Sequence, residues 1–121
     1  MAVYPGLVIE TRQKADILFG SSVPLPAATS FISDIRLVSG YALIAIFAVS
    51  DQAFGITVEE ACNPDDSFVQ TQPTILSALV DGKQQVCVRI QPCAPYMKMA
   101  LGNLGAPMDI LSFCARGLPL P

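Results

Sequence analysis

Apolar and polar residues alternate along several short stretches of this sequence. In residues 54–61, Phe54, Ile56 and Val58 are separated by smaller or polar residues, and residues 84–90 repeat the pattern. A period of two places alternate side chains on opposite faces of a β-strand, with the apolar set turned toward a core. Both stretches are therefore predicted to be strands with one buried face.

Residues 41–49 form a continuous apolar run instead of an alternating one. The frequent Ala and Leu would also fit a helix, but flanking turns limit its length, and Ile, Val and aromatic residues favour a strand. A strand without a polar face is expected to be buried on both faces or to pack against another subunit.

A hairpin is predicted around Asp81-Gly82, which separates residues 74–80 from residues 84–90. Two-residue type I′ turns need positive φ angles, and Asp-Gly is among the dipeptides that adopt them most readily. Residues 74–80 and 84–90 are thus expected to pair as neighbouring antiparallel strands.

The ten Pro and eight Gly divide the chain into short segments, a spacing typical of many short strands and few helices. The other strands predicted are residues 6–12, 15–20, 34–38, 96–101 and 108–116. A loop is expected at residues 21–33, and turns are expected at residues 62–67 and 102–105.

These elements predict an all-β fold with eight or nine short strands in one domain covering residues 1–121. An antiparallel β-sandwich with jelly-roll topology is the architecture that fits such a strand pattern best. An extended N-terminal arm at about residues 1–6 and a C-terminal tail at residues 117–121 are expected to lie outside the ladder, since Pro donates no backbone hydrogen bond.

The composition changes this picture by indicating a partner. Hydrophobic residues make up 52% of the 121 residues and charged residues 14%, against the usual charged fraction of ~25%. Such a balance excludes intrinsic disorder. It also leaves more apolar surface than one small domain can bury, which favours an oligomer or a component of a larger assembly.

Charge and hydropathy exclude several other partners. The net charge is −3 and the seven basic residues occur singly, whereas nucleic acid and anionic membranes need clustered basic side chains. The longest apolar run, residues 37–49, is shorter than the about 20 residues of a transmembrane helix. No signal-peptide pattern is present at the N-terminus, so synthesis in a cytoplasm is expected.

Catalytic and metal chemistry find little support in the sequence. Histidine is absent, which removes the most common general base and metal ligand. A nucleophilic serine paired with Lys14, Lys83 or Lys98 is the one catalytic arrangement left open. We therefore predict that the protein is not an enzyme and has neither cofactor nor metal.

The four cysteines, Cys62, Cys87, Cys93 and Cys114, lack the close pairs of a zinc site. Buried free thiols acting as small hydrophobic residues are expected, with a Cys87–Cys93 disulfide as the alternative.

Two pairs of adjacent carboxylates are candidates for catalysis or metal binding. Glu59 and Glu60 should point to opposite faces of their strand. Asp65-Asp66 is expected in a solvated turn, with a weak calcium site as the alternative.

Several short motifs follow one another along the chain. Ser-Gly-Tyr occupies residues 39–41, Ser-Asp-Gln-Ala residues 50–53 and Ala-Pro-Tyr residues 94–96, with Gly-Asn at residues 102–103 and Arg-Gly-Leu-Pro at residues 116–119. Across about residues 36–119, the order of these motifs resembles small β-sandwich structural proteins of tailed phages.

The resemblance implies a virion protein, specifically a head decoration (cement) protein. Such a protein would sit on the outer capsid surface as a homotrimer, bind the major capsid protein and bridge neighbouring capsid subunits. It would carry no catalytic residues and no cofactor. Binding that occurs only in the assembled shell would stabilise the head by linkage, and three copies would add to the effective affinity.

Apolar residues outside the predicted ladder are the candidates for this contact. They lie in the N-terminal arm, the 21–33 loop and the tail: Val3, Tyr4, Leu7, Val23, Leu25, Phe31, Leu118 and Leu120. The alternative is that these side chains close the sandwich's own core.

Two other functions are compatible with a small β-sandwich. One is a tail- or fibre-associated adhesion module that binds carbohydrate, although the chain has no Trp and only three Tyr to stack on sugars. The other is a single-jelly-roll shell subunit, for which 121 residues is short.

Overall fold

The computed structural model describes residues 16–21, 26, 29–108 and 111–119. These residues form eleven β-strands and no helix. The strands are β1 (Asp16–Ser21), β2 (Ser30–Ile32), β3 (Arg36–Leu37), β4 (Tyr41–Ser50), β5 (Phe54–Ala61), β6 (Val69–Gln70), β7 (Ile75–Leu76), β8 (Ala78–Val80), β9 (Lys83–Ile90), β10 (Tyr96–Asn103) and β11 (Leu111–Pro119).

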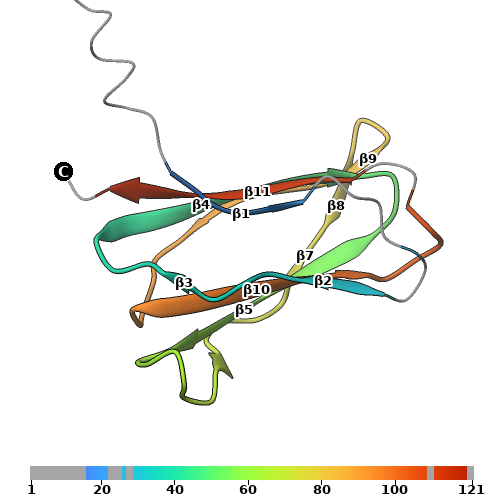
Figure 1. The fold of residues 1–121 in the computed structure, drawn as a ribbon. Helices are drawn as coiled ribbons and strands as arrows, with labels where there is room; N and C mark the ends of the chain where they lie inside the picture. Colours follow the sequence, from blue (N-terminus) through green and yellow to red (C-terminus); the bar gives the residue numbers. More distant parts are fainter. Residues whose placement is uncertain (1–15, 22–25, 27–28, 109–110, 120–121) are drawn as a thin grey trace, which may run out of the picture.

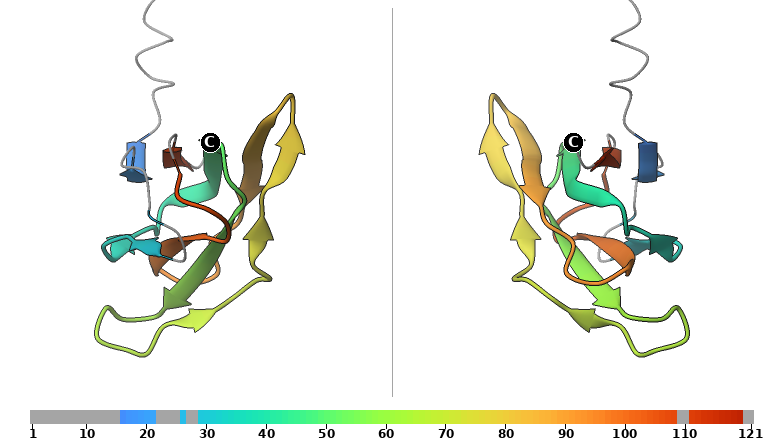
Figure 2. Two further views of the ribbon diagram at one scale, coloured as in Figure 1. Left: turned by 90° about the vertical axis from the view of Figure 1, so that its right-hand side faces the viewer. Right: turned by 90° about the vertical axis from the view of Figure 1, so that its left-hand side faces the viewer.

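The strands form two antiparallel sheets that face each other, as a β-sandwich requires (Figures 1 and 2). One sheet has five strands in the order β1-β11-β4-β9-β8. The other has the order β2-β10-β5-β6, with β3 also paired to β10 and β7 also paired to β5. The all-β sandwich predicted from the sequence is confirmed.

Most of the core consists of side chains from the inner faces of four long strands. β4, β5, β10 and β11 each contribute three of them: Ile44, Ile46 and Ala48; Phe54, Ile56 and Val58; Met97, Met99 and Leu101; Leu111, Phe113 and Ala115. β5 confirms the predicted alternation, since its three inward residues are at most 1% exposed. Burying each such aliphatic or aromatic side chain contributes roughly 1.5–3 kcal/mol.

β4 does not match the expectation of burial on both faces. Its inner residues Ile44, Ile46 and Ala48 are buried, while Phe47 on the outer face is 44% exposed. The continuous apolar run therefore covers one core face and leaves the other face apolar and accessible.

The predicted hairpin at Asp81-Gly82 is present between β8 and β9, which pair from Val80↔Lys83 onward. Asp81 has φ 50° and Gly82 has φ 77°. Two successive positive φ angles are what a type I′ turn requires, and glycine adopts them without steric cost.

The prediction of one strand over residues 74–80 is wrong, because this stretch crosses from one sheet to the other. Ile75 and Leu76 pair with β5, whereas residues 78–80 pair with β9. Ser77 lies at the crossing: its Oγ accepts a hydrogen bond from Phe54 N (3.0 Å) and donates one to Gln84 Oε1 (2.8 Å). Hydrogen bonds of the Ser77 hydroxyl thus supplement the backbone bonds at the point where the strand leaves its sheet.

The predicted end of the last strand is also wrong. Residues 117–119 continue β11, with Gly117 opposite Ile44, Leu118 opposite Leu43 and, after a register shift, Pro119 opposite Tyr41. Proline is tolerated at strand ends and bulges. Gly117 and Leu118 each have a backbone N–H group, so they can continue the hydrogen bonding of the strand. Only residues 120 and 121 of the expected tail lie outside the described residues.

The predicted loop at residues 21–33 contains a short strand. β2 pairs with β10 through Ile32↔Ala100 and Phe31↔Leu101, and the Ser33 amide donates to the Met99 carbonyl oxygen (2.8 Å). The strand predicted at residues 6–12 lies outside the described residues.

Candidate binding surface

The outer face of the five-stranded sheet carries two rows of residues centred on β4. In the first row, Cys114 of β11 and Cys87 of β9 lie on either side of Phe47. In the second, Arg116 and Arg89 lie on either side of Ala45. Each row spans two strand spacings, about 10 Å between the outer Cα atoms.

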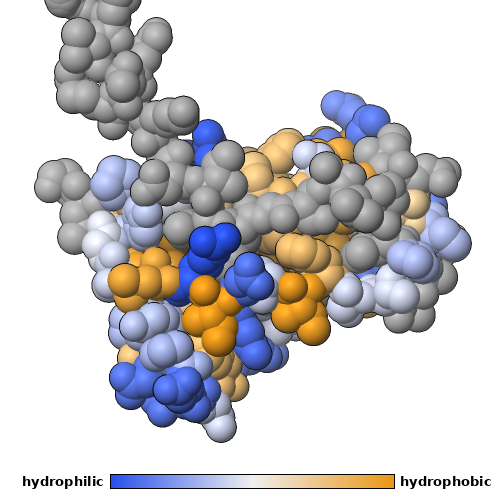
Figure 3. All heavy atoms as spheres, in the orientation of Figure 1, coloured by the Kyte–Doolittle hydropathy of each residue, from blue (hydrophilic) through white to orange (hydrophobic). Residues whose placement is uncertain are grey.

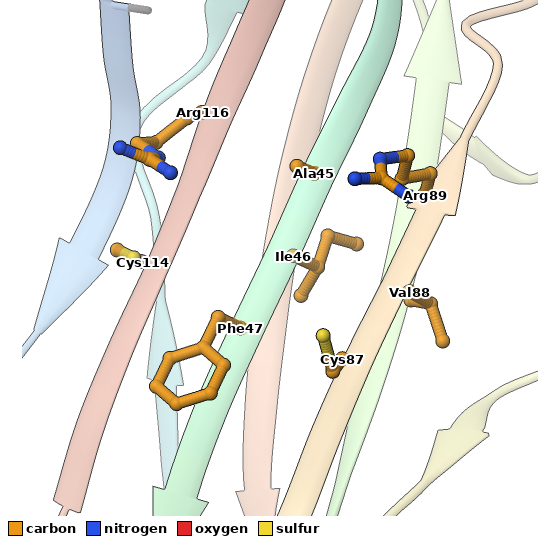
Figure 4. A pocket seen from close by; sticks show the side chains of 8 residues that line it. All are labelled: Ala45, Ile46, Phe47, Cys87, Val88, Arg89, Cys114 and Arg116. Carbon is orange, nitrogen blue, oxygen red and sulfur yellow. The ribbon is translucent and has the colours of Figure 1, made fainter.

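The two rows line a shallow hollow of about 370 Å³. Figure 4 shows Arg89 reaching from β9 toward Ala45, Arg116 extending from β11 toward β1, and the Phe47 ring between Cys114 and Cys87. The small side chain of Ala45 lowers the floor between the arginines, so a group from outside can approach the sheet at this point. A surface that combines an apolar floor with a few convergent polar groups is typical of a binding site.

The charge of this hollow opposes the charge of the chain. None of the described residues that line it is acidic, although the net charge of the protein is −3. Arg89 and Arg116 are both exposed. The ion pair between Lys98 Nζ and Glu59 Oε1 (3.6 Å) lies on the other sheet. Because they are exposed, the two arginines can be reached by an anionic group from outside.

The cysteines are free, as predicted, but the prediction that they are buried is wrong. Cys62, Cys87 and Cys93 are exposed, and Cys114 is half-buried. Cys87 and Cys114 stand about two strand spacings apart, beyond the ~7 Å Cα separation that a disulfide can span. Both thiols are thus part of the accessible floor of the hollow.

Of the predicted partner-binding residues, only Phe31 and Leu118 lie within the described residues. Phe31 is half-buried and packs edge-on against the ring of Phe113, with 6.1 Å between centroids. Leu118 is half-buried in the β11 ladder opposite Leu43. Phe31 therefore packs against the sandwich's own core, and its part in partner binding stays a prediction. The others lie outside the described residues: Val3, Tyr4, Leu7, Val23, Leu25 and Leu120.

Sequence reasoning missed the two arginines because they are scattered singly along the chain. The alternation in residues 84–90 places Cys87 and Arg89 on one face, which is the only local signal for the hollow. The pairing of β9 and β11 with β4 brings Arg116 to the same row as Arg89. That register is a tertiary property that no local pattern reports.

Large apolar side chains are also exposed along the edges of both sheets. β8 carries Leu79 and Val80, the β2–β3 edge carries Ile32, Ile35 and Leu37, and the β6–β7 edge carries Val69 and Leu76. Figure 3 shows separate apolar groups on the side of the molecule where β2 and β3 lie in Figure 1. Edge strands with exposed apolar side chains are favourable sites for association with other chains.

Glu60 is a buried carboxylate, 2% exposed, on the inner face of β5. Its Oε1 accepts hydrogen bonds from the amides of Cys93 (2.7 Å) and Ala94 (3.0 Å), and Thr71 Oγ1 donates to Oε2. The acceptor positions are thus used by the chain's own donors, and the residue joins the β9–β10 loop to β5. The neighbouring Glu59 points to the outer face, so the two carboxylates lie on opposite faces as predicted.

The other acidic residues that the structure describes form no site that resembles a metal centre. Asp65 and Asp66 are exposed in the turn after β5, as predicted, and Asn63 Nδ2 donates to Asp66 Oδ2 (3.2 Å). Among the described residues, no group of three or more His, Cys, Asp or Glu could hold a metal ion. These residues also include no helix with the length and hydropathy needed to span a membrane.

Three of the motifs that carry the resemblance contribute residues to turns, while Arg-Gly-Leu-Pro lies within β11. Gly40 has φ 96° in the turn before β4, and Ser50 Oγ accepts a hydrogen bond from Gln52 N (3.1 Å). Asn103 Nδ2 donates to the Ala106 carbonyl oxygen (3.0 Å), while its Oδ1 accepts from Gly105 N (2.9 Å). Gly40, Ser50 and Asn103 shape these turns and do not line the hollow, whereas Arg116, the first residue of the Arg-Gly-Leu-Pro motif, does.

Comparison of the chain with protein-family models, with curated proteins and with solved structures found no match.

Proposed function

We propose that this chain is a structural protein of a phage virion, a head decoration protein that binds the outer capsid surface and bridges neighbouring capsid subunits. The observation that carries the proposal is the apolar surface on the sheet edges, where Ile32 is 66% and Leu79 is 68% exposed. Water contact with this much apolar surface is unfavourable, so an assembled state that covers it is favoured.

The strand arrangement supports the same proposal. The chain passes between the sheets, and the orders β1-β11-β4-β9 and β2-β10-β5-β6 place β11 and β10 between strands far apart in sequence. These orders support the jelly-roll topology predicted from the sequence. Two-sheet jelly rolls occur among virion shell and lectin domains, and the short motifs described above resemble phage structural proteins in particular.

Native mass tests the assembly part of the proposal. Size-exclusion chromatography with light scattering, over a dilution series, should show a homotrimer that persists on dilution. A monomer at every concentration would contradict the trimer, and the exposed sheet edges would then have to bind a protein other than a second copy of this chain.

Location tests the virion part of the proposal. Antibodies raised against the purified chain should label the heads of virions in immunogold electron microscopy. Labelling of tails or fibres would favour the adhesion module instead, and virions without label would contradict both. Spontaneous formation of closed shells by the purified chain would favour the shell subunit.

A further inference from the structure

We propose that the hollow on the outer face of the five-stranded sheet binds an extended segment of the protein partner in which an acidic and an apolar residue stand two positions apart. This inference rests on the proposed function, because it describes the segment of the protein partner that one surface of the proposed decoration protein would bind. It assigns Arg89 and Arg116 to the acidic side chain and Phe47 to the apolar one.

The arginines define the acidic position. Arg89 and Arg116 lie opposite Ala45 on its two sides, and the lining of the hollow contains no described acidic residue. A guanidinium group presents donors in a planar fork that matches a carboxylate, and such charge-assisted pairs are the stronger hydrogen bonds of proteins. A carboxylate seated above Ala45 would lie next to the guanidinium of Arg89, with Arg116 on the strand at its other side.

The floor beside this position defines the apolar one. Phe47 is 44% exposed, and the thiols of Cys87 and Cys114 flank it in the neighbouring row. Phe47 and Ala45 are two residues apart on β4, which corresponds to about 7 Å along the strand. In an extended segment, side chains two positions apart point the same way and have the same spacing.

Charge complementarity favours a protein segment with this pattern over a second copy bound face to face. Two copies that joined this face to itself would bring four guanidinium groups together, and like charges at close range are unfavourable. An acidic and apolar segment supplies the opposite charge and covers Phe47 in the same contact.

Thiol alkylation offers a direct test because two cysteines lie in the hollow and two lie outside it. The purified chain would be treated with iodoacetamide with and without a blocked peptide, Thr-Glu-Thr-Leu-Thr or the reversed order Thr-Leu-Thr-Glu-Thr. Mass spectrometry would then give the rate at each cysteine. Cys87 and Cys114 should react more slowly with peptide present, while Cys62 and Cys93, which do not line this hollow, should keep their rates.

Matched peptides and variants separate the two parts of the site. Replacing the peptide glutamate by glutamine should weaken protection about tenfold or more, the scale of one charged hydrogen bond. The charge reversal Arg89→Glu with Arg116→Glu should abolish protection, and Lys83→Glu, exposed on the same strand but outside the hollow, should retain it. Arg89→Lys keeps the positive charge but lacks the planar guanidinium group, so its protection should be weaker than in Lys83→Glu and stronger than in the charge-reversal variant.

Several outcomes would overturn the inference. These are equal protection by the glutamate and glutamine peptides, protection by inorganic phosphate alone to the same degree, or no protection by either peptide order. Far-ultraviolet circular dichroism of each variant would show that the sandwich is intact, and each rate with peptide is compared with the same variant's rate without it.

The inference and the proposed function fail in different ways. A trimer with unprotected Cys87 and Cys114 would overturn this binding site and leave the assembly proposal standing. A monomer whose hollow thiols are protected by the glutamate peptide would support the site while contradicting the trimer.

Discussion

Ser77 and Phe54 exchange two hydrogen bonds: the Ser77 amide donates to the Phe54 carbonyl oxygen (2.9 Å), and the Phe54 amide donates to Ser77 Oγ (3.0 Å). Phe54 is completely buried. This contact lies where the chain leaves β7 in one sheet and enters β8 in the other. Because Ser77 Oγ also donates to Gln84 Oε1 of β9 (2.8 Å), Ser77 joins the two sheets at their connection.

Ser77→Ala should lower the free energy of unfolding by about 1–3 kcal/mol, because the Phe54 amide would lose its partner in a buried position. Chemical denaturation followed by circular dichroism measures this change. Ser112→Ala is the matched control, since Ser112 is exposed on β11 and should change stability by less than about 0.5 kcal/mol. Equal stability of the two variants would show that the Ser77 hydroxyl does not support the crossing.

Gly117→Ala should destabilise the fold by roughly 1–3 kcal/mol, the cost of overpacking a core. A Cβ atom at Gly117 would lie 2.5 Å from Cδ1 of the Tyr41 ring, whereas one at Gly102 would meet only Ser30 Oγ at 3.6 Å. Gly102→Ala is therefore the control for the loss of a glycine. Urea unfolding gives both values.

A double-mutant cycle with Tyr41→Ala would identify the cause of the Gly117 effect. Removing the ring opens the space that the new methyl group needs, so Gly117→Ala should cost much less in the Tyr41→Ala background. An unchanged cost would assign the effect to the β11 backbone instead of the Tyr41 ring.

Glu60→Gln should destabilise the protein by about 2 kcal/mol, because charge-assisted hydrogen bonds to the amides of Cys93 and Ala94 become neutral ones. Glu59→Gln is the control: its pair with Lys98 is exposed at 33%/36%, and such surface pairs contribute little. Thermal and denaturant unfolding at neutral pH would measure both. A larger effect at Glu59 would contradict the structural role of the buried carboxylate.

The apolar β2–β3 edge should matter for assembly more than for folding. Ile32→Ser with Leu37→Ser removes two exposed apolar side chains, so the proposed homotrimer should dissociate at a higher protein concentration, while the unfolding midpoint of the monomer changes little. Light scattering over a dilution series measures the trimer. Leu104→Ser, exposed to a similar extent in the loop after β10, is the control, and an equal effect of that variant would remove the edge from the interface.

Local pattern was sufficient for the elements whose cause is local. The alternation in residues 54–61 predicted β5 with its bounds as observed, and Asp81-Gly82 predicted the hairpin because its positive φ angles are a property of two residues. The apolar run at residues 41–49 predicts a strand, and β4 confirms it. Its outer face is also apolar, and no part of the described chain covers Phe47 on that face completely. The apolar run predicts that the strand is buried, but it does not show which of its two faces packs against the core.

The candidate site depended on strand pairing, which local pattern does not report. Arg89 and Arg116 meet only because β9 and β11 flank β4 in a specific register. A shift of one residue in either pairing would turn one arginine to the core face, and the two arginines would no longer lie on either side of Ala45.

The sequence by itself determined that this chain folds as an all-β sandwich with an apolar surplus, because alternation, turn residues and low charge act over a few residues at a time. Tertiary structure alone decided where the chain crosses at Ser77, that β11 continues to Pro119, and that two distant arginines share one hollow. These features arise from register and packing between segments far apart in sequence, whose free energy belongs to the assembled sheets and to no single segment.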